Sequence, residues 1–317
     1  MKDWRYRREL AVAALLGCIL LGLAIWAPAF YQAQPLLSLA TREAPSLIVT
    51  CGMVIVILTR QIDISVGSMF SVCGVVCGLL AASGWPVWSL LPAGVVIGGA
   101  MGAVNGVFIA GLGLPSIVVT LAMLVALRQG LNLFRQGEFV TLPDGVQWFG
   151  MSQVHGQIVV LCATGVLVAL LAYGLQRISL GRHFYAVGSD AEASRLAGLK
   201  PRRVTFLAFV FLGALTGIAA MVNVVQSPQV QPLSGYGMEL KVIAAVVVGG
   251  VAISGGRGYL WGAAVGLLLL ACISPALVYL HMEAYWEKAF QGAIILLAVL
   301  AEGLRARSAR RHRTDFS

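Results

Sequence analysis

Apolar runs of about 20 residues recur along the chain, with only short polar breaks between them. A helix needs about 20 predominantly apolar residues to cross the hydrocarbon core of a bilayer. Hydrophobic residues make up 59% of the 317 residues and charged residues only 11%, so little polar surface remains for a water-soluble domain. The sequence therefore predicts an all-α polytopic membrane protein that forms a single transmembrane domain over residues 1–317.

Breaks rich in Gly, Pro and charge divide the chain into ten predicted transmembrane helices. The second and eighth runs are short for a full crossing, which favours broken or re-entrant helices at those places. The first run is long for a secretory signal and lacks a convincing cleavage site, so we expect a retained helix. The ten runs are 9–28, 45–59, 64–83, 87–111, 115–134, 156–176, 204–224, 239–254, 258–280 and 284–303.

The basic residues predict the orientation. With the amino terminus in the cytoplasm, the cytoplasmic side receives 17 of the 22 Lys and Arg residues, as the positive-inside rule requires. Both termini, the loop 177–203 and the tail 304–317 are then cytoplasmic. Topology accounts for the net charge of +9, so nucleic acid is not an expected partner. The polar loops 135–155 and 225–238 face outward and are candidate contacts for an external partner.

Regular glycine spacing raises the question of an internal repeat. Small-residue faces let two helix backbones approach closely, and ten spans allow an inverted repeat in which helices five apart run in opposite directions. Such spacing also occurs in many membrane helices without a repeat, so both interpretations stand. The glycines concerned are Gly94, Gly98, Gly102 and Gly106 in the fourth span and Gly262 and Gly266 in the ninth.

The residues needed for catalysis are missing from the sequence. There is no GxxxxGK[ST] phosphate loop, and the four scattered histidines form neither a triad nor a metal site. "ISGGRG" (253–258) is interpreted as a Gly-rich turn. The few charges within the spans, such as Arg128 and Lys241, lie toward the outer ends, which disfavours ion coupling. We expect no enzyme, no metal and no cofactor, and the energy for any transport must come from a partner.

The segment 179–204 is polar and basic between two apolar runs. In "SDAEASRLAG", Ser189 or Asp190 can cap a short helix and Gly198 can end it. A short helix at the membrane surface could serve as a lever that a moving soluble partner pushes. It could equally be a solvated connection that only follows the charge distribution.

Four stretches carry a resemblance to a known family. They are "LTRQIDISVGS" (58–68), "GAVNG" followed by "LPSIVVTLA" (102–122), "SLGRHFYAVGSDAEASRLAGL" (179–199) and "ELKVIAAVVVGGVAISGGRGYLWGAAVG" (239–266). In sequence and order, they resemble the permease subunits of ATP-binding-cassette importers for ribose, arabinose, xylose, rhamnose and autoinducer-2. The resemblance implies a bacterial inner-membrane subunit, surrounded by lipid, that imports a monosaccharide or related polyol. Autoinducer-2 import and an ATP-independent secondary transporter or facilitator are the alternatives.

The resemblance also implies partners and a docking segment. A second permease, identical or paralogous, two cytosolic ATPase subunits that bind the ATP, and a periplasmic sugar-binding protein would complete the importer. The docking segment on the ATPase would comprise Gly188, Ser189, Asp190, Ala191, Glu192, Ala193, Ser194, Arg195, Leu196, Ala197 and Gly198.

Polar residues near the spans are candidates for a gate or a solute pathway. Asp63, with Ser65, Gly67 and Ser68 at the inner mouth, could form a gate or could cap the third span. Glu239 could meet solute or the binding protein, pair with Lys241, or cap its helix. Neutral side chains suit a hydroxyl-rich solute, although each could instead be a helix-packing group. The remaining candidates are Asn105, Ser116, Thr120 and Asn223.

Overall fold

A computed structural model describes residues 6–279, together with residues 283, 286, 288–290, 292, 293 and 296. The helices in this part of the chain are α1 (Tyr6–Trp26), α2 (Ala33–Leu58), α3 (Val66–Ala82), α4 (Val87–Gly106), α5 (Ser116–Arg135), α6 (Gln153–Arg177), α7 (Ser179–Ser189), α8 (Ala191–Leu196), α9 (Pro201–Val224), α10 (Met238–Val248), α11 (Leu260–Ala271) and α12 (Ile273–Tyr279). Single helical turns lie at η1 (Pro28–Tyr31), η2 (Val107–Gly111) and η3 (Gln147–Gly150), and strand β1 (Val140–Thr141) pairs with β2 (Gln229–Val230).

The prediction of an all-α polytopic membrane protein is confirmed. Six helical segments of the described chain are long and apolar enough to cross a bilayer: α2, α4 with η2, α5, α6, α9, and α11 with α12. Two shorter apolar helices lie within α1 and α3. The predicted tenth span, 284–303, falls mostly outside the described residues, and the tail 304–317 falls outside them entirely.

The second span is long, so the prediction of a short helix there was wrong. Helix α2 covers 26 residues and continues through Pro45. Proline has no N–H to donate, which leaves the carbonyl of residue 41 without its helical partner. The side chain of Gln226 fills this gap, because its Nε2 donates to the Thr41 carbonyl oxygen at 3.1 Å. Helix α2 therefore stays intact where the sequence indicated a break.

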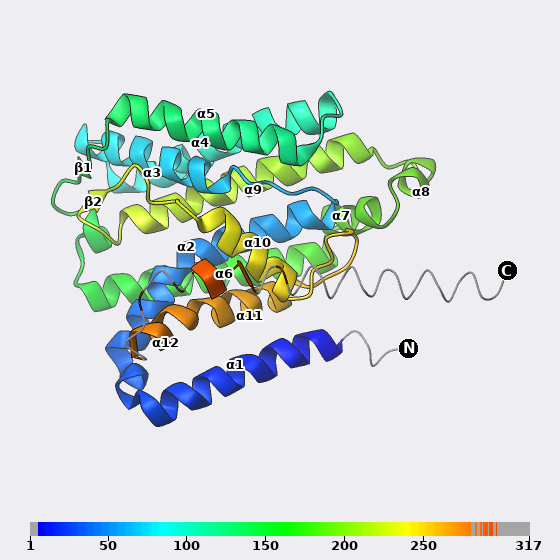
Figure 1. Ribbon diagram of the computed structural model, residues 1–317. Helices are drawn as coiled ribbons and strands as arrows, with labels where there is room; N and C mark the ends of the chain where they lie inside the picture. The colour runs from blue at the N-terminus through cyan, green and yellow to red at the C-terminus, as the bar shows by residue number, and fades with distance from the viewer. Residues whose placement is uncertain are drawn as a thin grey trace.

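The eighth span is broken, as predicted. Helix α10 has only 11 residues, and an irregular segment, 225–237, precedes it. Helix α3 repeats this pattern with 17 residues after the irregular segment 59–65. Figure 1 shows that segment 59–65 enters the bundle from the end that carries α7 and α8, and segment 225–237 from the end that carries the strands. We call these the α7–α8 end and the strand end, and α3 and α10 the broken helices.

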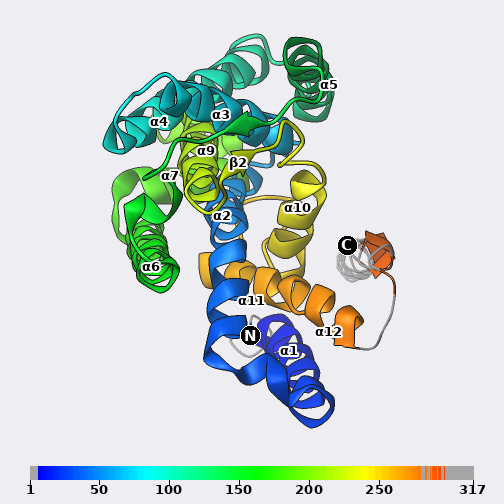
Figure 2. The same ribbon diagram turned by 90° about the vertical axis from the view of Figure 1, so that its left-hand side faces the viewer.

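Helices α2 and α9 lie side by side at the centre of the bundle (Figure 2). Helix α9 packs most closely on α4, where a Cβ at Gly98 would collide with the Gly213 carbonyl oxygen. The glycines of α11 serve a different contact, because a Cβ at Gly266 would collide with the Ala245 carbonyl oxygen of α10. The glycine faces of the fourth and ninth spans therefore each allow close packing on another helix, and they do not pack on each other. Opposite entry of the two broken helices supports an inverted repeat.

The two loops predicted to face outward are joined at the strand end. Val140 is paired with Val230 and Thr141 with Gln229, in antiparallel register. Both valines pack near Gly78 of α3, and the Trp148 amide donates to the Val225 carbonyl oxygen at 2.7 Å. This short sheet fixes the start of segment 225–237 and thereby the path of the chain toward α10.

Candidate functional site

Asp63 lies at the centre of a fully buried polar cluster at the start of α3. Its Oδ1 accepts hydrogen bonds from the Ser65 amide at 2.8 Å and the Ser65 hydroxyl at 2.6 Å. Its Oδ2 accepts one from Nδ2 of Asn105, the last-but-one residue of α4, at 3.0 Å. None of the three residues has any solvent exposure. These donors and the positive end of the α3 dipole offset part of the cost of burying the Asp63 carboxyl group.

The first turn of α5 lies against the same irregular segment. The Ile62 amide donates to the Ser116 hydroxyl at 3.4 Å, and Ser116 is the first residue of α5. Thr120, fully buried one turn later, donates back to the Ser116 carbonyl oxygen at 2.9 Å. This bond satisfies the Thr120 hydroxyl within its own helix, so Thr120 acts as a packing residue in this conformation.

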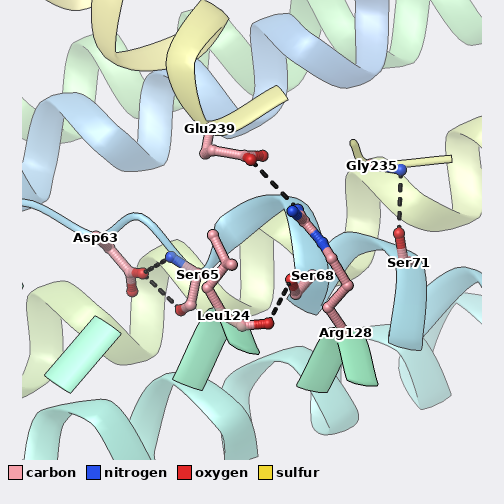
Figure 3. A network of polar contacts seen from close by, with 8 residues as sticks. All are labelled: Asp63, Ser65, Ser68, Ser71, Leu124, Arg128, Gly235 and Glu239. Atoms are coloured by element: carbon pink, nitrogen blue, oxygen red, sulfur yellow. Dashed lines mark hydrogen bonds and ion pairs between the residues drawn. The ribbon is translucent and has the colours of Figure 1, made fainter. Parts of the chain in front are cut away.

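The two broken helices meet where α3 begins. A Cβ at Gly67 would collide with the Gly235 carbonyl oxygen and with Oε2 of Glu239, so only glycine allows this approach. The Gly235 amide donates to the Ser71 hydroxyl at 3.0 Å. Ser68 faces α5 and donates to the Leu124 carbonyl oxygen at 3.0 Å. Figure 3 shows the hydrogen bonds from Gly235 to Ser71 and from Ser68 to Leu124.

Two ion pairs hold the first turn of α10. Oε1 of Glu239 lies 3.2 Å from Nη2 of Arg128 on α5, as Figure 3 shows, and Nζ of Lys241 lies 2.7 Å from Oε2 of Glu43 on α2. The four side chains are only 9–18% exposed. Glu239 therefore does not pair with Lys241, one of the predicted alternatives. Residues two apart on a helix point to different faces and cannot meet.

Two acceptor atoms at this site are buried and have no hydrogen-bond partner within the described part of the chain. They are Oδ1 of Asn105 and Oε2 of Glu239. A buried acceptor without a partner carries a desolvation cost, which a hydroxyl donor from solute or water would offset. The site therefore combines hydroxyl, amide and charged groups, and two of its acceptors lack a donor within the described chain.

The predicted pathway residues thus fall into one group with a single exception. The structure brings together Asp63, Ser65, Gly67, Ser68, Asn105, Ser116, Thr120 and Glu239 around the broken helices. Asn223 is half-buried one residue before the end of α9, at the strand end, and does not join them. Sequence reasoning did not assign Arg128, Ser71 or Gly235 to the site. Only Arg128 left a signal, as a charge within an apolar run.

A cavity elsewhere in the described chain has a different character. It has a volume of about 720 Å³ between α2, α4, α6 and α9, and its lining is apolar apart from the Thr164 hydroxyl and the Trp88 indole N–H. An apolar lining cannot replace the water bound by a sugar's hydroxyls. The cavity therefore suits hydrocarbon and not a polyol.

The predicted docking segment, 188–198, covers the last two residues of α7 and all of α8, at one end of the bundle. The Asp190 side chain caps α8, as expected, by accepting from the Glu192 amide at 2.9 Å and the Ala193 amide at 3.0 Å. Gly198 ends it with a φ of 85°. Glu192 and Arg195 form an exposed ion pair, which raises the pKa of the Arg195 guanidinium, and the Leu196 side chain is 79% exposed. Within the described residues, no three His, Cys, Asp or Glu side chains are placed to hold a metal ion.

A bundle of apolar helices in which two broken helices meet at a buried polar site is the architecture of a membrane transport permease. The family described as "Branched-chain amino acid transport system / permease component" matches residues 36–299, and the chain belongs to this family. It is a multi-pass membrane protein, and the family and its relatives are transport permeases.

Curated relatives match nearly the whole chain. The ribose import permease protein RbsC of Escherichia coli (strain K12) is 29% identical, over 95% of this chain and 95% of its own length. The autoinducer 2 import system permease protein LsrC of Enterobacter sp. (strain 638) is 32% identical, over 98% and 90%. LsrC of Escherichia coli (strain K12 / DH10B) is 33% identical, over 94% and 88%. No solved structure matches the chain.

Proposed function

We propose that the chain is the transmembrane subunit of an ATP-driven importer for a monosaccharide or related polyol. It forms the route across the inner membrane, and separate ATPase subunits bind and hydrolyse the ATP. A second permease copy or paralogue and a periplasmic sugar-binding protein complete the assembly. On this proposal the chain itself has no enzymatic activity and needs no cofactor or metal.

The observation that carries the proposal is the exposed helix α8 at the α7–α8 end. Leu196 is a large apolar side chain that is 79% exposed on a six-residue helix, beside the exposed pair of Glu192 and Arg195. An apolar anchor ringed by charges is typical of a surface that binds another protein. Because α8 belongs to a segment outside the apolar runs, the partner that fits it is a soluble one, the ATPase.

Charge supports an orientation in which the α7–α8 end faces the cytoplasm. Arg182 lies on α7 and Arg195 on α8, Arg60 binds the end of α7, and Arg257 follows Gly256, which also contacts that end. The strand end carries few cations, which agrees with an outward face under the positive-inside rule. We propose that both termini are cytoplasmic.

The solute is proposed from the chemistry of the polar site. The acceptors of Asn105 and Glu239 that have no partner in the described chain suit a solute that offers hydroxyl donors. Relatives named for the import of ribose and of autoinducer 2 agree with such a solute. Identities of 32–33% to the LsrC proteins make autoinducer 2 the second candidate.

Uptake by proteoliposomes tests the proposal. Proteoliposomes contain the purified chain, alone or with the ATPase that copurifies with it. Labelled ribose or autoinducer 2 is supplied to them bound to its binding protein. We expect uptake only with both the ATPase and ATP. Uptake by the chain alone would instead establish an ATP-independent transporter or facilitator. Uptake of autoinducer 2 but not ribose would select the second solute.

The docking surface has its own test in binding to the ATPase. The variant Leu196→Asp, and separately the double variant Glu192→Ala/Arg195→Ala, should weaken copurification at least tenfold without loss of membrane insertion. Leu233→Asp is the matched control, because Leu233 is 51% exposed at the strand end and undergoes the same chemical change. Equal copurification of all three variants would show that α8 is not the docking site.

A further inference from the structure

Arg60 ties the end of α2 to the end of α7. Its Nε donates to the Gly188 carbonyl oxygen and its Nη2 to the Ser189 carbonyl oxygen, both at 2.5 Å. The two bonds span 128 and 129 residues of sequence. Arg60 also has a φ of 64°, a conformation that a non-glycine residue adopts at a cost and keeps only where its surroundings hold it. One planar guanidinium donates to both carbonyl oxygens, a geometry that lysine cannot reproduce.

The loop after α10 reaches the same point. The Gly256 amide donates to the Leu58 carbonyl oxygen at 2.9 Å, and the Ser189 hydroxyl donates to the Gly256 carbonyl oxygen at 3.4 Å. One turn earlier on α7, the Tyr185 hydroxyl donates to the Gly258 carbonyl oxygen at 3.0 Å. Burial, with a smaller contribution from Tyr259, raises the pKa of Tyr185, so its phenol keeps the proton that it donates.

Glycine is required for this close approach. A Cβ at Gly188 would collide with the Leu58 carbonyl oxygen, and one at Gly256 would collide with Ser189. Gly255 and Gly256 also have φ values of 79° and 68°, which disfavour other residues. The "ISGGRG" segment is therefore more than the turn that the sequence indicated: it is a contact that fits against the end of α7. We call Arg60, Gly188, Ser189 and Gly256 the Arg60 junction.

Both broken helices are connected to the Arg60 junction by only a few residues. Arg60 is followed by Asp63 and then by the start of α3 at Val66. Gly256 lies in the loop that follows the end of α10 at Val248. A displacement of α7 at its Ser189 end therefore acts on the amino end of one broken helix and on the carboxyl end of the other. Those two helices are in contact at Gly67 and Gly235.

We propose that Arg60 is a positioning residue that passes movement of α7 and α8 to the broken helices α3 and α10 together. This inference rests on the proposed coupling to an ATPase. Motion of α8 pulls on the Gly188 and Ser189 carbonyls, and the guanidinium carries that motion into segment 59–65. Through Gly256, the same motion reaches α10 from its other end, so the polar site between the two helices changes shape in one step.

Hydrogen exchange in the complex with the copurifying ATPase tests the inference without knowledge of the solute. Peptides over 61–68 and 234–241 are followed with and without ATP, using an ATPase variant that binds ATP but does not hydrolyse it. In the wild type, we expect ATP to change the exchange rates of both peptides. In Arg60→Ala, the ATP-induced change in exchange rate should be at least threefold smaller in both peptides, while the complex still assembles. Arg60→Lys should lose at least half of that change.

Arg182→Ala is the matched control. Arg182 lies on α7 and donates to the Arg177 carbonyl oxygen at 2.8 Å, away from the Arg60 junction, so its loss should leave the ATP response unchanged. If the ATP-induced change in exchange is the same in Arg60→Lys as in the wild type, the inference is overturned. Arg60→Lys provides this test even where Arg60→Ala does not assemble with the ATPase. A wild-type complex with no ATP response at either peptide also overturns it. Failure of the proposed function is distinct, since it means that no ATPase copurifies or that uptake needs no ATP.

Discussion

The two broken helices begin in the same way but are held by different chemistry. The start of α3 is fixed by hydrogen bonds among Asp63, Ser65 and Asn105, all without solvent exposure. The start of α10 is held by two ion pairs, from Glu239 and Lys241 to α5 and α2, whose side chains keep 9–18% exposure. The ion pairs are about as short as the hydrogen bonds, but the attraction between opposite charges persists over longer distances and so tolerates displacement better. We interpret the Asp63 cluster as a rigid unit that moves together with the start of α3, and the ion pairs of α10 as the contacts that adjust when the two helices shift relative to each other.

Removal of one partner of a nearly buried ion pair should cause the largest loss of stability. Lys241→Met leaves the Glu43 carboxylate nearly buried and without its cation, which should lower the free energy of unfolding by about 3 kcal/mol. The double variant Glu43→Gln/Lys241→Met should recover most of this loss. The measurement is denaturant unfolding in mixed micelles.

The control for that experiment is an exposed ion pair. Glu138 pairs with Arg135 at 3.8 Å, and its side chain is 78% exposed, so Glu138→Gln should cost less than about 1 kcal/mol. If Lys241→Met costs no more than Glu138→Gln, then α10 is not held by charge and the contrast between the two helices fails.

The contact between the broken helices should give the next largest effect. Gly67→Ala places a methyl group against the Gly235 carbonyl oxygen and Glu239, which should cost about 2 kcal/mol and separate α3 from α10. Gly74→Ala, in the same helix, meets only Val230 Cγ1 at 3.5 Å and should be neutral or slightly stabilising. Both are measured by thermal unfolding, and equal midpoints would contradict the close approach.

The Asp63 cluster should respond to loss of acceptors more than to loss of charge. Asp63→Ala leaves the Ser65 amide without its acceptor and Asn105 Nδ2 with only the Ser65 hydroxyl as acceptor, and should cost about 1.5 kcal/mol. Asp63→Asn should cost less, under about 1 kcal/mol, because Oδ1 of Asn105 has no partner and can accept from the new amide after a flip. The measurement is the free energy of unfolding of both variants. A larger loss of stability in Asp63→Asn than in Asp63→Ala would mean that the charge itself is required.

The smallest loss of stability should come from removal of the Gln226 side chain, which supplies the hydrogen bond that Pro45 in α2 cannot donate. Gln226→Ala removes the donor to the Thr41 carbonyl oxygen and should cost about 1 kcal/mol. In a Pro45→Ala background, the alanine amide can supply that hydrogen bond, so Gln226→Ala should then cost close to nothing. A double-mutant cycle measures the difference, and equal costs in both backgrounds would show that Gln226 does not compensate for Pro45.

Local sequence signals predicted those features that depend on neighbouring residues. The lengths of the apolar runs gave the all-α membrane class, Asp190 gave the cap of α8, and the short eighth run gave the broken helix α10. Most of the candidate pathway residues did meet around α3. In each case the pattern reports a requirement that the segment must satisfy by itself, such as length, capping or a break.

Features that depend on distant partners could not be predicted. The second run looked short because nothing near Pro45 reveals that Gln226, 185 residues from Thr41, supplies the missing donor. The choice of Arg128 for Glu239, and of Glu43 for Lys241, depends on how α10 packs against α5 and α2. The Gly-rich segment 253–258 likewise showed its role only when placed beside Ser189.

Structures of the assembled complex, without nucleotide and with ATP, test the central claim most directly. We predict that α8 lies in a groove of the ATPase on the cytoplasmic side in both states. On ATP binding, the Arg60 junction should stay closed while α10 shifts relative to α3 at the polar site. An α7–α8 end that is bare or faces outward would contradict the claim, as would an ATP-bound state in which that site keeps its shape.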